Sequence, residues 1–334
     1  MMAAAPKPMS AEDRLIARYF RPIAKHPGAL RLTDDAAILT PPKGAEVVLT
    51  VDAIVGGVHF FESDPPDMVA RKALRVNLSD LAAKGAKPAG FLLTLALPKW
   101  AGEDWVKAFA RGLGADAKRY ACPLLGGDSV RTPGPVTISI TAFGTLPEGT
   151  MVSRSGAKPG DHIFVTGTIG DAALGLALRQ GGVSQSTMFA RHHDHLEKRY
   201  LLPQPRNALG EALRCHAGAA MDVSDGLVGD LAKLCAASGI SGEVEIARVP
   251  LSSAAGEVVK CTPHLIETVL TGGDDYEIVC TVPPRRLKTF LAAAAGAGVP
   301  VTEIGVVAKG RAGARFVGPD GKPCAFKRAS FSHF

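Results

Sequence analysis

Hydrophobic and polar residues follow two different periods along this chain. Apolar runs of strand-like length occupy residues 47–55, 91–98 and 136–146. Between them, apolar residues recur with a helical period over longer stretches, of which 69–86 and 103–121 are the clearest. Alternation of strands with amphipathic helices is typical of the α/β class, which is the fold class that we predict.

Local signals predict further elements. Ser10 can cap a helix through residues 11–20, and residues 287–298 form an alanine-rich helical segment. CPLLGGDSV predicts a strand that ends in a Gly-Gly-Asp turn, whereas residues 180–206 look polar and irregular. Residues 165–176 have the order strand, glycine-rich turn and helix, which could cradle an anion or could be a tight connection.

The length of 334 residues indicates two domains, because a single compact core of this size is at its practical limit. The stretch from Pro147 to Pro159 contains Pro and Gly residues and is the best candidate for the boundary. We therefore predict an N-terminal α/β domain over residues 1–150 and a C-terminal α/β domain over residues 151–334.

Composition places the chain among ordinary globular proteins, with 46% hydrophobic and 21% charged residues. The net charge of +6 is spread along the sequence, and it suits a phosphorylated small substrate as well as a polyanion. Aromatic residues do not interleave with the basic ones, so we expect no surface that stacks single-stranded nucleic acid.

The six cysteines are widely spaced and lack a C-x-x-C motif, which indicates reduced core thiols rather than a zinc site or a disulfide framework. The N-terminal segment lacks the apolar region of a signal peptide, and no stretch reaches the ~18–20 apolar residues of a membrane span. We therefore expect a cytoplasmic protein that does not contact a membrane.

Aspartates are the main candidate site residues of this sequence. They occur before a short apolar run (Asp34, Asp35), within a predicted strand (Asp52) and at predicted strand or helix ends (Asp80, Asp128, Asp222, Asp225). Each one alone can be a helix cap or a turn residue, although Asp is disfavoured in a strand that looks as buried as residues 47–55. Together they fit a site for hard, oxygen-liganded cations such as the Mg²⁺ that accompanies nucleotide phosphates.

A weak internal repeat links some of these aspartates. Ser79-Asp80 precedes Gly126-Gly127-Asp128, and the two aspartates are 48 positions apart. Ser224-Asp225 precedes Gly272-Gly273-Asp274, and there the separation is 49 positions. The repeat reflects either related architectures in the two halves of the chain or chance.

Other candidate sites are weaker. The chain lacks the G-x-x-x-x-G-K-[ST] motif of P-loop kinases, and GLGADA (112–117) follows a helix instead of the strand that dinucleotide binding requires. His192, His193 and His195 could bind a metal, but a solvated helix or loop is the simpler interpretation. His59 is the one histidine that we place in the site, with a packed core histidine as the alternative.

From about Leu15 to the C-terminus, a series of motifs resembles the thiamine-monophosphate kinase family, with weak stretches near 180–200 and 285–325. The motifs are TDDAAIL, TVDAIVGGVHF, KALRVNLSDLAAKGAKP, LLGGDSVR, SRSGAKPGDHIFVTGTIGDAALGL, MDVSDGLVGDL and LTGGDDYEI. The resemblance implies ATP-dependent conversion of thiamine monophosphate to thiamine diphosphate with several Mg²⁺ ions. It also implies the two-domain fold of aminoimidazole-ribonucleotide synthetase, whose N-terminal sheet pairs across a homodimer.

The resemblance also implies roles for individual residues. The Mg²⁺ ligands would be Asp35, Asp52, Asp80, Asp128, Asp222 and Asp225, with Thr50 and Val51 beside Asp52 in the metal loop. The nucleotide contacts would be Gly127, Asp128, Arg154 and Ser224. The contacts to thiamine monophosphate would be His59, Asp274 and a C-terminal aromatic residue, which we take to be Phe331.

The chain departs from the family pattern in four places. Thr33 stands where the family usually has Gly, and Val51 lacks a hydroxyl group, so only its backbone carbonyl could bind a metal. Asp274 replaces the usual Glu and has a shorter side chain. The ending FSHF differs from the usual Y/W-D-H-F.

The implied mechanism requires no general base, because the attacking phosphate oxygen is already anionic at neutral pH. Mg²⁺ ions and Arg154 would offset the repulsion between two polyanions. Two alternatives stay open: a relative of aminoimidazole-ribonucleotide or selenophosphate synthetase, and a non-catalytic nucleotide-binding scaffold. A selenophosphate synthetase would carry a reactive Cys or selenocysteine in a Gly-rich N-terminal segment, whereas the first cysteine here is Cys122. A scaffold would have lost several metal aspartates, and this chain keeps them.

Overall fold

The computed structural model describes residues 10–181, 187–310 and 313–331. The chain divides into two compact units. Unit 1 consists of Met1–Lys43, Leu49–Asn77 and Pro88–Gly144, and unit 2 consists of Gly44–Val48, Leu78–Lys87 and Thr145–Phe334. Each unit has one sheet, and the alternation of strands and helices confirms the predicted α/β class.

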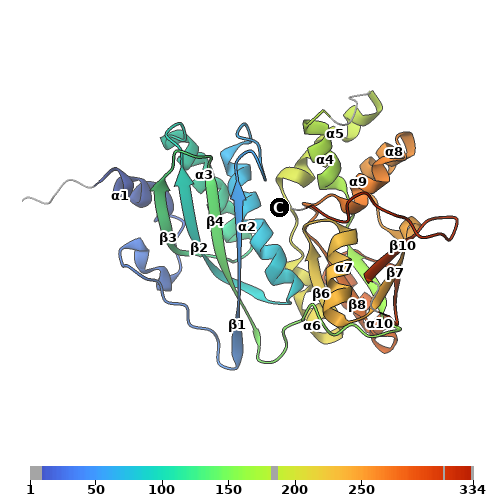
Figure 1. The fold of residues 1–334 in the computed structure, drawn as a ribbon. Helices are drawn as coiled ribbons and strands as arrows, with labels where there is room; N and C mark the ends of the chain where they lie inside the picture. The colour runs from blue at the N-terminus through green and yellow to red at the C-terminus, as the bar shows by residue number, and fades with distance from the viewer. Residues whose placement is uncertain (1–9, 182–186, 311–312, 332–334) are drawn as a thin grey trace, which may run out of the picture. The chain divides into compact units, whose positions relative to one another are not determined.

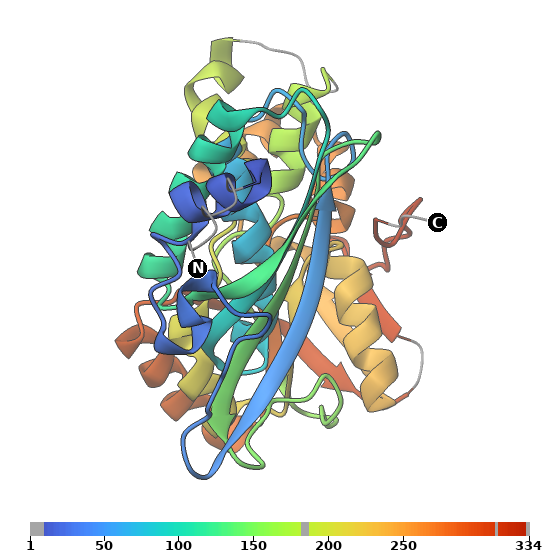
Figure 2. The same ribbon diagram turned by 90° about the vertical axis from the view of Figure 1, so that its left-hand side faces the viewer.

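The sheet of unit 1 has four strands in the order β1-β4-β2-β3. The strands are β1 (Ala45–Val55), β2 (Lys87–Leu97), β3 (Leu124–Arg131) and β4 (Thr137–Pro147), and the long helices are α2 (Pro66–Ala83) and α3 (Glu103–Arg119). Strands β2 and β3 run parallel, so α3 is the crossover helix between them. Helices α2 and α3 lie on the same side of the sheet (Figure 2).

Strand β1 is an edge strand whose residues alternate between a half-buried and an exposed face. Leu49 is 62% exposed and Val51 is 61% exposed. The expectation that residues 47–55 form a buried strand is therefore wrong for one face of it. An aspartate at position 52 lies on the half-buried face and not in a closed core.

The N-terminal helix begins where the sequence predicts. Ser10 caps α1 (Ala11–Leu15) in a capping box with Asp13, and the π-helical segment η1 (Ile16–Phe20) completes the expected helix. The 3₁₀ segment η2 (Pro27–Leu32) follows, and it ends with left-handed backbone angles at Leu30, Arg31 and Leu32.

The sheet of unit 2 has six strands in the order β10-β7-β9-β5-β8-β6. Four of them, β6, β7, β8 and β10, are labelled in Figure 1. The six strands are β5 (His162–Thr166), β6 (Ala219–Val223), β7 (Ser241–Glu245), β8 (Glu277–Val282), β9 (Val301–Ala308) and β10 (Gly313–Val317). The helices are α4 (Asp171–Arg179), α5 (Thr187–Leu201), α6 (Gly210–His216), α7 (Leu227–Ser238), α8 (Ser253–Cys261), α9 (Leu265–Thr271) and α10 (Leu287–Gly296).

Both faces of the second sheet are buried. Along β5, Ile163 and Val165 belong to one hydrophobic cluster and Phe164 belongs to another, as a strand with side chains on alternate faces requires. Helices α4, α7, α8 and α9 contribute to the first cluster, and α6 and α10 contribute to the second. Strand β6 therefore belongs to a sheet that is covered on both faces, and Asp222 lies near the C-terminal end of this strand.

Some expectations about elements need correction. Residues 180–206 are not irregular throughout, because α5 runs from Thr187 to Leu201. Strand β3 does not end at the Gly-Gly-Asp turn but continues through it to Arg131. The internal repeat does not mark equivalent elements, since Asp80 lies within the continuous helix α2 whereas Asp225 lies in a loop before α7.

All six cysteines are free in the structure. Cys122, Cys235 and Cys280 are buried as core thiols, and burial raises the pKa of each. The other three, Cys215, Cys261 and Cys324, are exposed, so the core interpretation is wrong for them. Within the described part of the chain, no helix is long and apolar enough to cross a membrane.

Candidate functional site

The predicted site residues fall in both units. In unit 1 they are Asp35, Thr50, Val51, Asp52, His59, Gly127 and Asp128. In unit 2 they are Asp80, Arg154, Asp222, Ser224, Asp225, Asp274 and Phe331.

A cavity of about 720 Å³ in unit 1 brings three of these residues together. Asp35, Gly127 and Asp128 all line it, and much of the remaining wall is apolar, including Phe20 and Phe143. An apolar cavity with a few convergent polar groups is the usual form of a small-molecule site. This one could hold a flat apolar group and place a charged group beside two carboxylates.

Gly127 is required by the backbone at the edge of this cavity. It has a φ of 155°, and a Cβ atom at this position would overlap the carbonyl oxygen of Leu93 on the neighbouring strand β2. Only glycine fits that close approach. The adjacent Asp128 accepts a hydrogen bond from its neighbour Ser129 through Oδ1 (2.9 Å).

Asp52 is held by helix α2. Its N–H donates to Asn77 Oδ1 at 3.0 Å, and the buried Asn77 in turn donates from Nδ2 to the carbonyl of Ala73. Asn77 thereby fixes strand β1 at the point where Asp52 and the half-buried Thr50 lie. Val51 points to the opposite, exposed face, which leaves its backbone carbonyl as the atom that could serve a metal.

His59 lies in the turn after β1 and is half-buried. Its Nδ1 accepts the N–H of Val55 at 3.0 Å, so in the neutral ring the proton is on Nε2. Its carbonyl accepts from Lys72 Nζ at 2.9 Å.

In unit 2, a buried aspartate fixes the loop that follows β6. Asp230, on the first turn of α7, accepts the N–H groups of Ser224 (3.0 Å) and Asp225 (2.9 Å) through one oxygen. Its side chain is fully buried, and burial raises its pKa, although these bonds together with Lys233 offset part of the desolvation. Of the three aspartates of MDVSDGLVGDL, Asp230 is therefore a structural residue.

A second loop is attached to the first by backbone hydrogen bonds. The N–H of Asp274 donates to the Ser224 carbonyl, and the N–H of Tyr276 donates to the Val223 carbonyl, both at 2.8 Å. Asp274 (φ 69°) and Tyr276 (φ 50°) both adopt left-handed backbone angles, which are uncommon outside glycine.

The C-terminal segment reaches the same place. The N–H of Phe331 donates to the carbonyl of Asp225 at 3.0 Å, and the Phe331 side chain is half exposed. The structure thus brings together four predicted residues of unit 2, namely Ser224, Asp225, Asp274 and Phe331.

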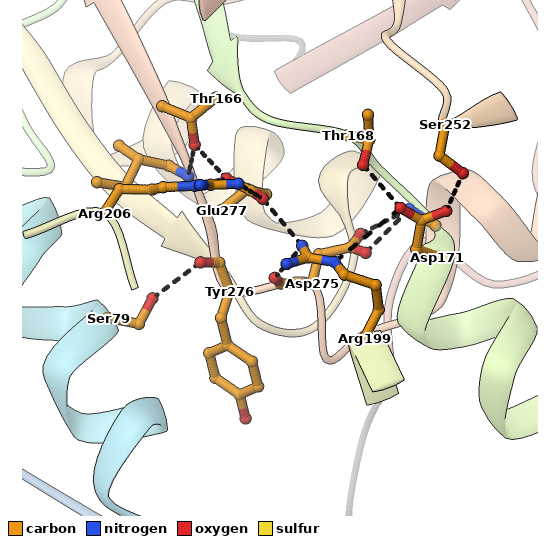
Figure 3. A network of polar contacts seen from close by, with 12 residues as sticks. Ser79, Thr166, Thr168, Asp171, Arg199, Arg206, Ser252, Asp275, Tyr276 and Glu277 are labelled. Carbon is orange, nitrogen blue, oxygen red and sulfur yellow. Dashed lines mark hydrogen bonds and ion pairs between the residues drawn. The ribbon is translucent and has the colours of Figure 1, made fainter. Parts of the chain in front are cut away.

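A buried polar network supports the second loop (Figure 3). Glu277, which is fully buried, accepts from Thr166 Oγ1 (2.6 Å), from Arg199 (2.9 Å) and from two nitrogens of Arg206 (2.6 and 2.5 Å). The ring of Tyr276 points away from these groups (Figure 3). None of the network residues was predicted, although charged residues inside the apolar motif LTGGDDYEI are the signal that could have indicated them.

The glycine-rich turn before α4 does bind a carboxyl group, but this group belongs to the protein. Both carboxylate oxygens of Asp275 accept the N–H of Gly170, at 2.9 and 3.0 Å. Burial raises the pKa of Asp275 well above its ordinary value, against the opposing effects of this hydrogen bond and of the Arg199 charge. Of the two interpretations of residues 165–176, the tight connection therefore fits.

Lys84 interacts electrostatically with three further predicted residues. Its Nζ donates to the Ala220 carbonyl on β6 at 2.8 Å. Burial lowers its pKa and so does the charge of Arg154, whereas the charges of Asp222 and Asp80 raise it. The charges of these three side chains therefore act on one ammonium group, which the sequence did not identify even though Lys84 lies in the motif LAAKGAKP.

Lys233, on α7, is a second unpredicted cation. Its Nζ donates to Asp225 Oδ2 at 2.6 Å and to Asp230 Oδ1 at 2.8 Å. Burial acts to lower its pKa, but the hydrogen bonds to Asp225 and Asp230 outweigh burial and the pKa is raised.

The histidine group lies on α5, in agreement with a helical interpretation. His195 Nε2 is 3.1 Å from Asp171 Oδ2, and His192 Nε2 is 3.3 Å from Glu257 Oε2. Among the residues that the structure describes, no group of three or more His, Cys, Asp or Glu side chains is arranged as a metal cluster.

Two family models match the chain. The N-terminal domain of AIR synthase related proteins matches residues 33–146, and the C-terminal domain matches residues 158–318. The thiamine-monophosphate kinase of Caulobacter vibrioides is 45% identical over 299 residues, which cover 88% of this chain and 83% of that protein. The thiamine-monophosphate kinase of Escherichia coli K12 is 39% identical over 325 residues, covering 97% and 98%.

Solved structures show the same similarity. The thiamine-monophosphate kinase of Stenotrophomonas maltophilia superposes with a TM-score of 0.82 at 38% identity, over 94% of this chain and 98% of that one. AaThiL, solved as a complex with AMPPCP and TMP, superposes with a TM-score of 0.76 at 32% identity, over 90% and 91%. The hydrogenase maturation protein HypE, at 18% identity and a TM-score of 0.77, shares the fold alone.

We predict that Glu277→Gln lowers the free energy of unfolding by about 3–5 kcal/mol, because it removes the buried charge that pairs with Arg199 and with the partly buried Arg206. Urea unfolding followed by circular dichroism measures this change. Glu303→Gln is the matched control, since Glu303 pairs with His162 and Arg248 at a partly exposed position and should cost less than about 1 kcal/mol. Equal, small losses for both variants would contradict the assigned importance of Glu277.

Proposed function

The chain belongs to the thiamine-monophosphate kinase family of AIR synthase related proteins, and we propose that it uses ATP to phosphorylate thiamine monophosphate to thiamine diphosphate. The observation that carries this proposal is the similarity to thiamine-monophosphate kinases along nearly the whole chain. AaThiL, with 32% identity, binds AMPPCP and TMP together in one structure, and these correspond to the two substrates proposed here.

The reaction transfers the γ-phosphoryl group of ATP to a phosphate oxygen of thiamine monophosphate. That oxygen is anionic at neutral pH, so the protein needs to position two polyanions and neutralise their charge without removing a proton. We assign the ATP to the cavity of unit 1, which Gly127 lines and where Asp35 and Asp128 face the same space. Arg154 and Ser224 are the proposed nucleotide contacts of unit 2.

The proposed Mg²⁺ ligands offer carboxylate and carbonyl oxygens, the hard donors that this ion prefers. The resemblance assigns six aspartates to Mg²⁺, namely Asp35, Asp52, Asp80, Asp128, Asp222 and Asp225, with Thr50 and Val51 beside Asp52, and the first five are the ones that we propose as ligands. When bound, Mg²⁺ would neutralise charge that develops on the transferred phosphoryl group. Lys84 joins this set as a cation, because its Nζ is held by the Ala220 carbonyl and its charge interacts with those of Asp80, Asp222 and Arg154.

Thiamine monophosphate carries a cationic thiazolium ring as well as its phosphate. Asp274 supplies a carboxylate from a loop whose backbone is fixed by Ser224, and Phe331 supplies an exposed aromatic ring beside Asp225. A carboxylate and an aromatic face both suit a flat organic cation. We assign Asp274 and Phe331, together with His59, to the recognition of this substrate.

The first test is ADP release measured in a coupled assay with Mg²⁺ and ATP, with and without thiamine monophosphate. We expect release that depends on thiamine monophosphate, with thiamine diphosphate as the second product. Asp128→Asn keeps the shape of the cavity but removes a charge that would hold the cation, so it should lower kcat/KM by about 100-fold or more. ADP release that is independent of thiamine monophosphate would contradict the proposed function and favour another ATP-dependent enzyme of this fold.

Asp274 gives a second, more specific prediction. Asp274→Ala should raise KM for thiamine monophosphate by about tenfold or more and leave KM for ATP within about twofold, because the lost carboxylate faces the organic cation. Asp274→Glu should retain recognition, since Glu is the usual family residue. Weaker binding of Mg²⁺–ATP with unchanged KM for thiamine monophosphate would show that Asp274 has a different role.

We also propose a homodimer formed through unit 1. Leu49 and Val51 expose apolar side chains on the edge strand β1, a position where a second sheet can pair. Sedimentation velocity should give a dimer at micromolar concentration, and Leu49→Lys should shift it toward monomer. Leu291→Lys, which changes an exposed leucine of α10 in unit 2, should leave the dimer unchanged. A wild-type monomer would contradict the proposal.

A further inference from the structure

Lys233 makes Asp225 different from the five aspartates that we propose as Mg²⁺ ligands. Its ammonium nitrogen is 2.6 Å from Asp225 Oδ2, the distance of a charge-assisted hydrogen bond. Asp225 is otherwise the sixth aspartate that the family resemblance assigns to Mg²⁺. One of the two oxygens of its carboxylate is already paired with a cation that belongs to the protein.

The position of this ammonium group is fixed on two sides. Nζ also donates to Asp230 Oδ1 at 2.8 Å, and Asp230 is a fully buried residue one helical turn away on α7. The other oxygen of Asp230 accepts the N–H groups of Ser224 and Asp225. Lys233, Asp230 and the backbone of the loop therefore form a ring of hydrogen bonds that includes Asp225.

A divalent ion on Asp225 would be close to the Lys233 ammonium. A Mg²⁺ ion lies about 2.0–2.1 Å from a ligating oxygen, so it would be within a few ångströms of Nζ. Repulsion between a unit charge and a double charge at that range weakens binding, even where solvent reaches the site. Asp225 and Lys233 are both partly exposed, so the effect is moderated by water but not removed.

We propose that Lys233 replaces a divalent cation at Asp225, so that this carboxylate serves as the anchor of a lysine and not as a metal ligand. The inference deepens the proposed function, on which it rests, by naming the cation at one position of the phosphate site. The ammonium group of Lys233 has three N–H donors, and the bonds to Asp225 and Asp230 use two of them. The third N–H can donate to a phosphate oxygen, so Lys233 supplies a positive charge at this end of the site.

The test counts Mn²⁺ ions bound to the full-length protein without nucleotide, by electron paramagnetic resonance and by calorimetry. Wild type is compared with Asp225→Asn, Lys233→Met, Lys233→Arg and the double variant Asp225→Asn/Lys233→Met. We expect Asp225→Asn and Lys233→Arg to leave the number and affinity of bound ions unchanged within about twofold. Lys233→Met should gain one Mn²⁺ ion or bind it at least about tenfold more tightly, and the double variant should lose that gain.

Two outcomes would overturn the proposal. One is the loss of a bound Mn²⁺ ion in Asp225→Asn, which would make Asp225 a ligand in the wild-type protein. The other is unchanged Mn²⁺ binding in a folded Lys233→Met variant, with folding checked by circular dichroism. If Lys233→Met does not fold, the result for Asp225→Asn decides alone. Failure of the proposed kinase activity would appear in the ADP-release assay and would leave these Mn²⁺ counts unaffected.

Discussion

Unit 2 depends on one carboxylate that is removed from water. Glu277 begins strand β8 in the core, and an unpaired charge there would be costly. Arg199 from α5 and Arg206 from the segment after it provide the compensating charges. The ion cluster therefore ties a surface helix to the central sheet at the first residue after the loop that carries Asp274 and Tyr276.

That loop has little freedom as a result. Its N-terminal part is hydrogen-bonded to the Ser224 loop, and Asp275 within it is held by the N–H of Gly170. The Ser224 loop is in turn fixed by the buried Asp230. The backbone that carries proposed substrate residues is thus fixed by three sets of contacts. A binding site that is to be preorganised before the ligand binds requires this kind of support.

The sequence predicted what is encoded locally and missed what depends on distant partners. The strands at residues 47–55, 91–98 and 136–146 and the capped helix at Ser10 follow from periodicity and capping. The joint location of Asp35, Gly127 and Asp128 on one cavity agrees with the motifs that singled them out. Family resemblance supplied their roles, which periodicity could not.

Other features have no local signature. Helix α5 was missed because its charged residues look like those of a solvated loop, while Arg199 is in fact buried against Glu277. Lys84 and Lys233 were missed because a sequence does not show which lysine meets which carboxylate. Strand β3 was cut short because Gly-Gly-Asp is a frequent turn sequence, whereas here the glycine is needed for close contact with β2.

At position 274 the left-handed backbone favours a short side chain, whereas contact with a ligand favours a longer one. Asp and Asn enter this region several times more readily than longer residues, because a short polar side chain can interact with its own backbone. Glu extends one methylene further toward a ligand but occupies the same angles at a greater cost in strain. A lineage that exchanges Glu for Asp here would thus gain stability in the loop and shorten its contact with the substrate. Selection at this one position therefore acts on loop stability and on substrate affinity in opposite directions.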